Sequence, residues 1–228
     1  METDALVALA TQRLSEAADP EKAGPMAAYL KTDMPFYGVQ KAGRVPIRRE
    51  IKARFPPADP EEYRKAVLAL WNLPHREEKY LAIGYARSFP AHIAPASLPL
   101  YRKMIVEGAW WDLVDGVASD LVGTVLLDAR SETTPTIEAW IDDPDLWLRR
   151  TAIICQLGHE HRTDADLLFR ACEARMAETE FFIRKAIGWA LRQYARTDPD
   201  AVRRFVIDHR DRMSGLSYRE ATKHLEVE

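Results

Sequence analysis

One acidic and three basic side chains recur at a near-constant spacing in the second half of the chain. Asp115, Arg150, Arg184 and Arg219 are separated by steps of 35, 34 and 35 residues, and Tyr80 lies 35 residues before Asp115. If repeats of this length bring the five positions to one surface, a carboxylate lies beside a row of guanidinium groups. Arginine suits phosphates, so the pattern predicts a groove for a polyanion with one reactive acid inside it. The alternative is that each arginine pairs with an acid of the neighbouring repeat.

Two of the six tryptophans are close in sequence to these positions. Trp111 precedes Asp115 by four residues, which places both side chains on one face of a helix. Trp189 follows the small residue Ala186 by three residues, near the same series of positions. Aromatic faces beside a carboxylate can hold a cation by electrostatic and cation–π attraction. Packing between helices is the expectation for the other isolated tryptophans, Trp71, Trp140 and Trp147.

The apolar residues between these positions are spaced as in helices. The segment 179–194 shows the spacing most clearly, at Phe182, Ile183, Ala186, Ile187, Ala190, Leu191 and Tyr194. Aspartate caps helices and proline is tolerated at their first position. Four Asp-Pro pairs therefore predict helix starts: Asp19-Pro20, Asp59-Pro60, Asp143-Pro144 and Asp198-Pro199. No segment alternates like a strand before a tight hairpin turn, so we expect an all-α chain.

An internal repeat indicates how these helices are arranged. Ala82, Val117, Ala152, Ala186 and Ala221 follow one another at steps of 35, 35, 34 and 35 residues. A period of about 35 residues with two helices per unit is typical of α-solenoids, which present a long concave face. We therefore predict a single α-solenoid domain over residues 1–228.

The charge and the apolar content exclude several classes of protein. The 228 residues carry 32 basic and 35 acidic side chains, a net charge of −3. This balance argues against coating nucleic acid through bulk charge, but it leaves room for a local basic groove. One basic run, Lys41, Arg44, Arg48 and Arg49, either contacts DNA phosphates or forms a solvated helix face. The lack of a long apolar run argues against a membrane span.

No cofactor or metal ion is expected. Cys155 and His159 could share a helix face beside Glu160 and His161, but further ligands for a closed site are lacking, so a helix end is the preferred interpretation. Cys155 and Cys172 are the only cysteines, which is no disulfide framework. An acidic N-terminus argues against a secretory signal, and the cytoplasm is the expected location.

Several blocks of sequence, in order, resemble the AlkD-type DNA alkylation repair proteins. These blocks are Met34-Pro-Phe-Tyr-Gly-Val39 with Pro46-Ile-Arg-Arg49, Leu70-Trp-Asn-Leu-Pro-His-Arg-Glu77, Trp110-Trp-Asp-Leu-Val-Asp115, the stretch 143–153, and Lys185-Ala-Ile-Gly-Trp-Ala-Leu-Arg192. The resemblance extends from about residue 19 to residue 225. It implies a HEAT-like repeat DNA glycosylase that removes N3- and N7-alkylated purines from double-stranded DNA. It also implies that the enzyme acts without flipping the base.

The resemblance also implies roles for individual residues. The family's catalytic aspartate falls on Asp115, and its active-site tryptophans fall on Trp111 and Trp189. Its groove arginine falls on Arg150, and a tyrosine of the DNA-facing cleft falls on Tyr29. From the residue pattern alone we add three DNA contacts: Arg184, Arg44 and Arg48.

The chemistry that follows is a monofunctional hydrolysis, because no lysine aligns with the predicted cluster and the nearest is Lys185. A monomer is expected. Two other classes of function stay open. One is a non-catalytic repeat protein that binds damaged or branched DNA, and the other is a protein–protein scaffold.

Overall fold

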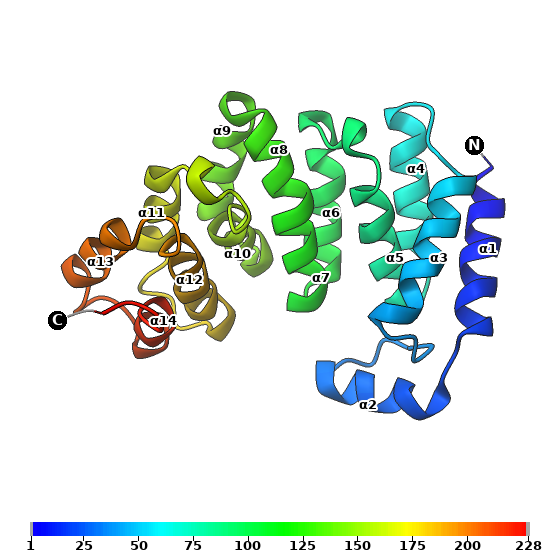
Figure 1. Cartoon of the computed structure of the whole chain (residues 1–228), viewed down its shortest axis with the longest axis horizontal. Coiled ribbons are helices and arrows are strands. Elements are labelled where there is room, and N and C mark those ends of the chain that lie inside the picture. Colours follow the sequence, from blue (N-terminus) through cyan, green and yellow to red (C-terminus); the bar gives the residue numbers. More distant parts are fainter. Residues whose placement is uncertain (1, 227–228) are drawn as a thin grey trace. The chain divides into compact units, whose positions relative to one another are not determined.

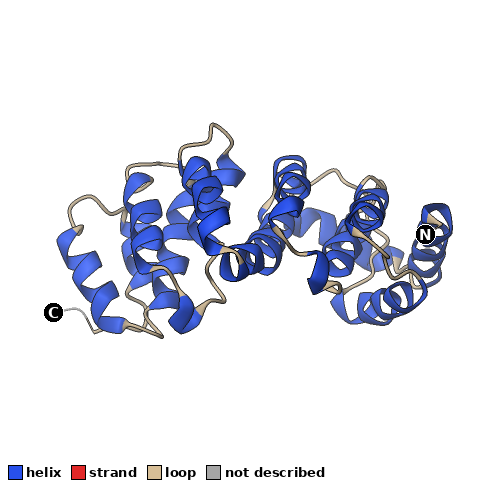
Figure 2. Ribbon diagram, turned by 90° about the horizontal axis from the view of Figure 1, so that it is seen from above, coloured by secondary structure: helices blue, strands red, loops and turns tan. Residues whose placement is uncertain are grey.

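The computed structural model of the chain describes residues 2–226, and all regular elements in that range are helices (Figures 1 and 2). The predicted all-α class is therefore confirmed. The chain divides into two compact units, Met1–Ile93 and Ala94–Glu228, and each is described by itself. One domain over residues 1–228 stays a prediction. Between residues 2 and 226, no helix combines the length and the apolar character that crossing a bilayer requires.

The first unit holds five α-helices and a short 3₁₀ turn. They are α1 (Thr3–Glu16), α2 (Pro20–Leu30), α3 (Lys41–Arg54), α4 (Pro60–Trp71), α5 (Arg76–Arg87) and the turn Pro90–His92. Helix α1 packs against α3 and α4, and α5 packs against the same two helices. Helix α2 has no comparable interface: only its last residue, Leu30, is buried. Figure 1 shows α2 set below the layer that the other four helices form.

The second unit continues with α-helices of 6 to 14 residues. They are α6 (Leu98–Gly108), α7 (Trp111–Gly116), α8 (Gly123–Asp128), α9 (Arg130–Ile141), α10 (Leu146–Ile154), α11 (Ala165–Ala174), α12 (Phe181–Tyr194), α13 (Pro199–Asp208) and α14 (Gly215–Ala221). One 3₁₀ turn, Pro95–Ser97, precedes α6, and another, Glu160–Arg162, lies between α10 and α11. Helices α9 and α12 both pack against α10, and α14 packs closely against α12.

The 35-residue series marks the helices that stack on one another in this unit. Val117, Ala152, Ala186 and Ala221 are all buried, and Ala82 is buried in α5 of the first unit. The helices that carry the four residues of the second unit pack in sequence order, each against the next. The predicted repeat is therefore confirmed as a stack of helical repeats, as in an α-solenoid.

Three of the four predicted Asp-Pro helix starts are confirmed, and one is wrong. Helices α2, α4 and α13 begin at the proline of each pair, at Pro20, Pro60 and Pro199. Helix α10 begins at Leu146 rather than at Pro144, because Asp145 is the residue that caps it. The Asp143 side chain instead accepts from the backbone N–H of Asp145 at 2.9 Å and shapes the preceding turn.

Helices α7 and α8 are joined without a break by a π-helical segment, Val117–Val122. The Ser119 hydroxyl donates to the Asp115 carbonyl at 2.7 Å, and the Thr124 hydroxyl donates to the Asp120 carbonyl at 2.8 Å. Interruptions of this kind occur often at functional sites, and this one begins two residues after the predicted catalytic aspartate.

Candidate active site

Asp115 and Arg150 form a two-pronged ion pair between neighbouring repeats. The Arg150 Nε donates to Asp115 Oδ1 and its Nη2 donates to Oδ2, both at 2.8 Å. The third donor, Nη1, reaches the carbonyl oxygen of Phe182 at 2.6 Å. The guanidinium therefore ties α10 to α7 on one side and to the start of α12 on the other. Paired donors of this geometry fix both the distance and the plane of a carboxylate.

This pair is largely withdrawn from water. The Arg150 side chain is 4% exposed and the Asp115 side chain is 18% exposed. Burial raises the pKa of the Asp115 carboxyl above its ordinary value, and the hydrogen bonds and charge of Arg150 oppose that shift without cancelling it. The site thus presents a partly desolvated carboxylate that keeps some contact with solvent. Such a group interacts more strongly with a nearby positive charge than it would in water.

The sequence left two interpretations of the arginine row: contact with a polyanion, or pairing with an acid of the neighbouring repeat. For Arg150 the structure shows the pairing. Its guanidinium is occupied by Asp115 and Phe182. A contact between Arg150 and a DNA phosphate stays a prediction, and it requires this side chain to be rearranged. Arg184 differs, because it is half-buried on α12 and its Nε has no hydrogen-bond partner among the described residues.

An aromatic cluster lies against the pair. The rings of Trp110, Trp147 and Phe182 approach one another at centroid distances of 5.0, 5.2 and 6.0 Å. The Arg150 guanidinium carbon lies 6.0 Å from the Phe182 ring centroid. Trp147 is 6% exposed and packs as predicted, as do Trp71 and Trp140. The cluster excludes water from one side of the ion pair.

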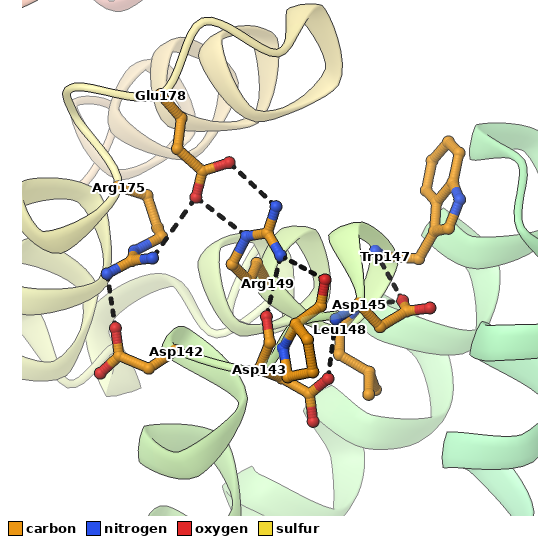
Figure 3. A network of polar contacts seen from close by, with 9 residues as sticks. Asp142, Asp143, Asp145, Trp147, Leu148, Arg149, Arg175 and Glu178 are labelled. Atoms are coloured by element: carbon orange, nitrogen blue, oxygen red, sulfur yellow. Dashed lines mark hydrogen bonds and ion pairs between the residues drawn. The ribbon is translucent and has the colours of Figure 1, made fainter.

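A second polar network fixes the start of α10 and thereby places Arg150 (Figure 3). Arg149 donates to both oxygens of Glu178, at 2.9 and 3.1 Å, and to the carbonyl oxygens of Asp143 and Pro144. Arg175 bridges the same glutamate to Asp142. Adjacent arginines therefore have different tasks: the first holds the helix start in place, and the second holds the carboxylate.

The predicted tryptophans lie on the two helices that flank α10. Trp111 opens α7, one turn before Asp115, and it is half-buried. Trp189 lies on α12 and is also half-buried. Gly188, the residue before it, packs so closely on α14 that an added Cβ would lie 2.8 Å from the Ser217 carbonyl oxygen. The glycine therefore sets how deeply α12 seats beside α14.

The remaining predicted DNA contacts belong to the first unit. Tyr29 lies on α2 and is 75% exposed. Arg44 lies on α3, where it donates to the Val39 carbonyl at 2.7 Å and stacks over the Tyr80 ring at 4.3 Å. Arg48 follows one turn later, and its side chain lies against Gly84 of α5. The structure thus brings Asp115 and Arg150 together in one unit and places these three residues in the other.

Two contributors were missed by reasoning from the sequence. Phe182 supplies the carbonyl that takes the third donor of Arg150, and Trp110 joins the aromatic cluster. Phe182 was predicted only as part of the apolar face of its helix. A backbone acceptor does not depend on residue type, so nothing in the sequence marks the Phe182 carbonyl.

A metal centre has no support within residues 2–226, where no group of three or more His, Cys, Asp or Glu side chains is placed to hold an ion. His159 instead contacts the Gly123 carbonyl through Nε2 at 2.9 Å. Cys155 and Cys172 are free and buried, and burial raises the pKa of the Cys155 thiol to about 12. Neither thiol is placed to react with a solvent-borne substrate.

The fold and the site define a class: a helical-repeat protein in which neighbouring repeats enclose a carboxylate–guanidinium pair. A family model described as DNA alkylation repair enzyme matches residues 10–225. A solved structure named "Predicted DNA alkylation repair enzyme from Enterococcus faecalis" is 30% identical, with 91% of this chain and 96% of that chain covered at a TM-score of 0.84. A comparison with curated proteins finds no match. The chain belongs to the DNA alkylation repair enzyme family, as the motif blocks predict.

Proposed function

We propose that the protein is a DNA glycosylase that removes purines alkylated at N3 or N7, such as 3-methyladenine and 7-methylguanine, from duplex DNA. The observation that carries the proposal is the Asp115 carboxylate, held at both oxygens by Arg150 and only 18% exposed. The ion pair also joins two repeats, but a carboxylate that keeps an accessible edge repels a phosphate backbone, and this favours a catalytic role over simple DNA binding. Membership of a DNA alkylation repair family supplies the substrate class.

The proposed reaction uses the positive charge of the alkylated base. The bond between the sugar C1′ and the base nitrogen breaks, and its electron pair neutralises the departing base. The sugar then resembles an oxocarbenium ion, as in other glycosidic cleavages. The Asp115 carboxylate stabilises that charge and accepts a proton from the water whose oxygen bonds to C1′. Because the base leaves neutral, no general acid is needed to protonate it.

In this scheme Arg150 is a positioning residue. Its two donors keep the carboxylate in one plane and favour the ionised form against the effect of burial. Trp111 and Trp189 are proposed to line the sugar on either side and to favour its positive charge. Their placement on α7 and α12, the helices on both sides of α10, is consistent with that role.

DNA contacts outside the reacting sugar are assigned to Arg184, Arg44, Arg48 and Tyr29. The Arg184 Nε is buried and has no hydrogen-bond partner among the described residues, so a contact with a phosphate oxygen requires the guanidinium to turn toward solvent. A monofunctional reaction is supported by Lys185, whose ammonium pairs with Glu220 at 2.6 Å and is not poised as a nucleophile. Action on an unflipped base and a monomeric state complete the proposal.

Release of free bases from methylated duplex DNA tests the proposal. We expect chromatography to detect both 3-methyladenine and 7-methylguanine above a control without enzyme, with the sugar–phosphate strand left uncut. Salt-dependent DNA binding without base release would instead identify a non-catalytic binder of damaged or branched DNA. Absence of both binding and release would leave the protein–protein scaffold.

A further inference from the structure

A buried glutamate in the first unit holds a loop that the proposed chemistry does not use. The Glu77 side chain lies at the start of α5 and is fully buried. Its carboxylate accepts three successive backbone N–H groups, from Tyr37 at 3.1 Å, Gly38 at 2.9 Å and Val39 at 3.0 Å. Successive N–H groups that converge in this way form an anion-binding concavity. Here the anion is part of the protein.

The same loop is fastened on its other side to α2. The Tyr37 carbonyl accepts from the Asp19 backbone N–H at 2.8 Å, where α2 begins. Gly38 has a φ of 84°, and an added Cβ would lie 2.0 Å from the Asp19 carbonyl oxygen. The Tyr37 ring stacks on His75 at 4.0 Å, and its hydroxyl donates to Glu78 at 2.9 Å. This loop, residues 37–39, is therefore the junction of α2, α3 and α5.

Helix α3 begins two residues after this junction and carries a one-sided charge. At 100° per residue five of its six cations, Lys41, Arg44, Arg48, Arg49 and Lys52, fall within an arc of about 140°, and only the terminal Arg54 lies outside it. The single acid of the helix, Glu50, lies on the opposite side, where it pairs with Arg13 and Arg54. The arc of five cations, the basic face of α3, is suited to a polyanion.

The basic face is oriented from the junction. Arg44 donates to the carbonyl of Val39, whose own N–H is held by Glu77. Arg44 also stacks on Tyr80, which follows Glu77 by three residues on α5. Helix α5 thus holds both the loop that precedes α3, through Glu77, and Arg44 of the basic face, through Tyr80.

The geometry points to Glu77 as a positioning residue for DNA binding: its carboxylate sets the orientation of the basic face of α3 toward the phosphate backbone. The inference rests on the proposed function only in taking duplex DNA as the polyanion. Glu77 lies in the first unit, whereas Asp115 and Arg150 lie in the second. Loss of Glu77 should therefore weaken DNA binding far more than the chemical step.

Binding of an undamaged duplex, measured over a range of salt concentrations, tests this inference. We expect Glu77→Ala to weaken binding about tenfold and to reduce the slope of log K against log salt by about 1 to 2, because one or two phosphate contacts are lost. Excision from methylated DNA at saturating enzyme should change by less than about threefold. The matched control is Glu61→Gln, which removes an exposed charge on α4.

Chemical rescue sharpens the test. Formate should occupy the three N–H groups left by Glu77→Ala and restore part of the affinity, whereas chloride at the same ionic strength should not. If the alanine variant fails to fold, Glu77→Gln replaces it. The glutamine keeps one acceptor oxygen, but its NH₂ group takes the place of the second oxygen and cannot accept a hydrogen bond from the loop. Unchanged affinity and salt slope in a folded Glu77 variant would overturn the inference. Wild-type binding without excision would contradict only the proposed function.

Discussion

Arg150 reaches back 35 residues to hold both oxygens of Asp115 at 2.8 Å. This separation is the repeat length, so the stacking of one repeat on the next brings the carboxylate and the guanidinium together. The contact has two consequences. It orients a carboxylate in a place where burial would favour its protonated form, and it uses an arginine that would otherwise be available to a phosphate.

Replacing Arg150 should expose its effect on the Asp115 carboxyl. Arg150→Lys keeps the charge but loses the planar pair of donors, so we expect single-turnover excision to fall about tenfold. Arg150→Gln also removes the positive charge that lowers the pKa of Asp115. Activity requires the ionised carboxylate, so it is lost as the pH falls through that pKa. The acid limb of the pH–rate profile should therefore move to higher pH in Arg150→Gln. Acid limbs at the same pH in wild type and Arg150→Gln would contradict the assignment of Arg150 as the residue that keeps Asp115 ionised.

Arg184 should behave as a phosphate contact. It lies on α12, and its buried Nε lacks a partner among the described residues, so no internal hydrogen bond to this nitrogen has to break when the guanidinium turns toward a phosphate. Arg184→Gln should reduce the slope of log K against log salt by about 0.9 for duplex DNA, with a small effect on excision at saturation. The matched control is Arg170→Gln on α11, whose guanidinium is exposed and paired with Glu138. Equal losses in the two variants would argue for a general charge effect.

Gly188 should be required for the seating of α12 on α14. A Cβ at this position would lie 2.4 Å from the Glu220 Cβ and 2.8 Å from the Ser217 carbonyl oxygen. Gly188→Ala should therefore lower the free energy of unfolding by about 1–3 kcal/mol. Gly24→Ala on α2 is the helical control, because nothing lies within 4 Å of its added Cβ. It should be neutral or stabilising. Urea unfolding compares the two, and similar midpoints would contradict the packing argument.

His159 should make the protein less stable in mild acid. Burial of the ring lowers its pKa, and the nearby charges of Arg130 and Arg162 lower it further. The unfolded chain therefore binds a proton more readily than the folded one below about pH 6.5. Stability is fully present above that pH and falls as the pH drops towards the lowered folded value. His159→Gln should show a smaller decrease in Tm between about pH 7 and about pH 5. The exposed His161→Gln should follow the wild type.

The fold was largely predictable because short-range sequence patterns indicate both the helices and their repeat. Helix spacing along α12 and the repeat anchors at Val117, Ala152 and Ala186 predicted the stack of buried helices that the structure shows. The start of α10 was predicted two residues too early, because Asp143 and Asp145 are both able to cap and the sequence does not rank them. The π segment after Asp115 was not predicted, since its hydrogen bonding has no composition of its own.

The candidate site was predictable in its residue types but not in its pairing. Spacing placed Asp115 and Arg150 in equivalent positions of consecutive repeats, and it left open whether the arginine faced a phosphate or an acid. The answer depends on side-chain burial and on the Phe182 carbonyl, which is a backbone group. The role of Glu77 was hidden for the same reason: its three partners are backbone N–H groups.

Single-turnover release of 7-methylguanine from methylated duplex DNA, by wild type and Asp115→Asn side by side, tests the central claim most directly. Asparagine keeps the size of the side chain and removes the charge that is proposed to stabilise the sugar. We predict at least about a tenfold loss in rate, about 1.4 kcal/mol of transition-state stabilisation, with DNA affinity nearly unchanged. Asp128→Asn, an exposed aspartate at the end of α8, should retain the wild-type rate. Equal rates for Asp115→Asn and wild type would contradict the account.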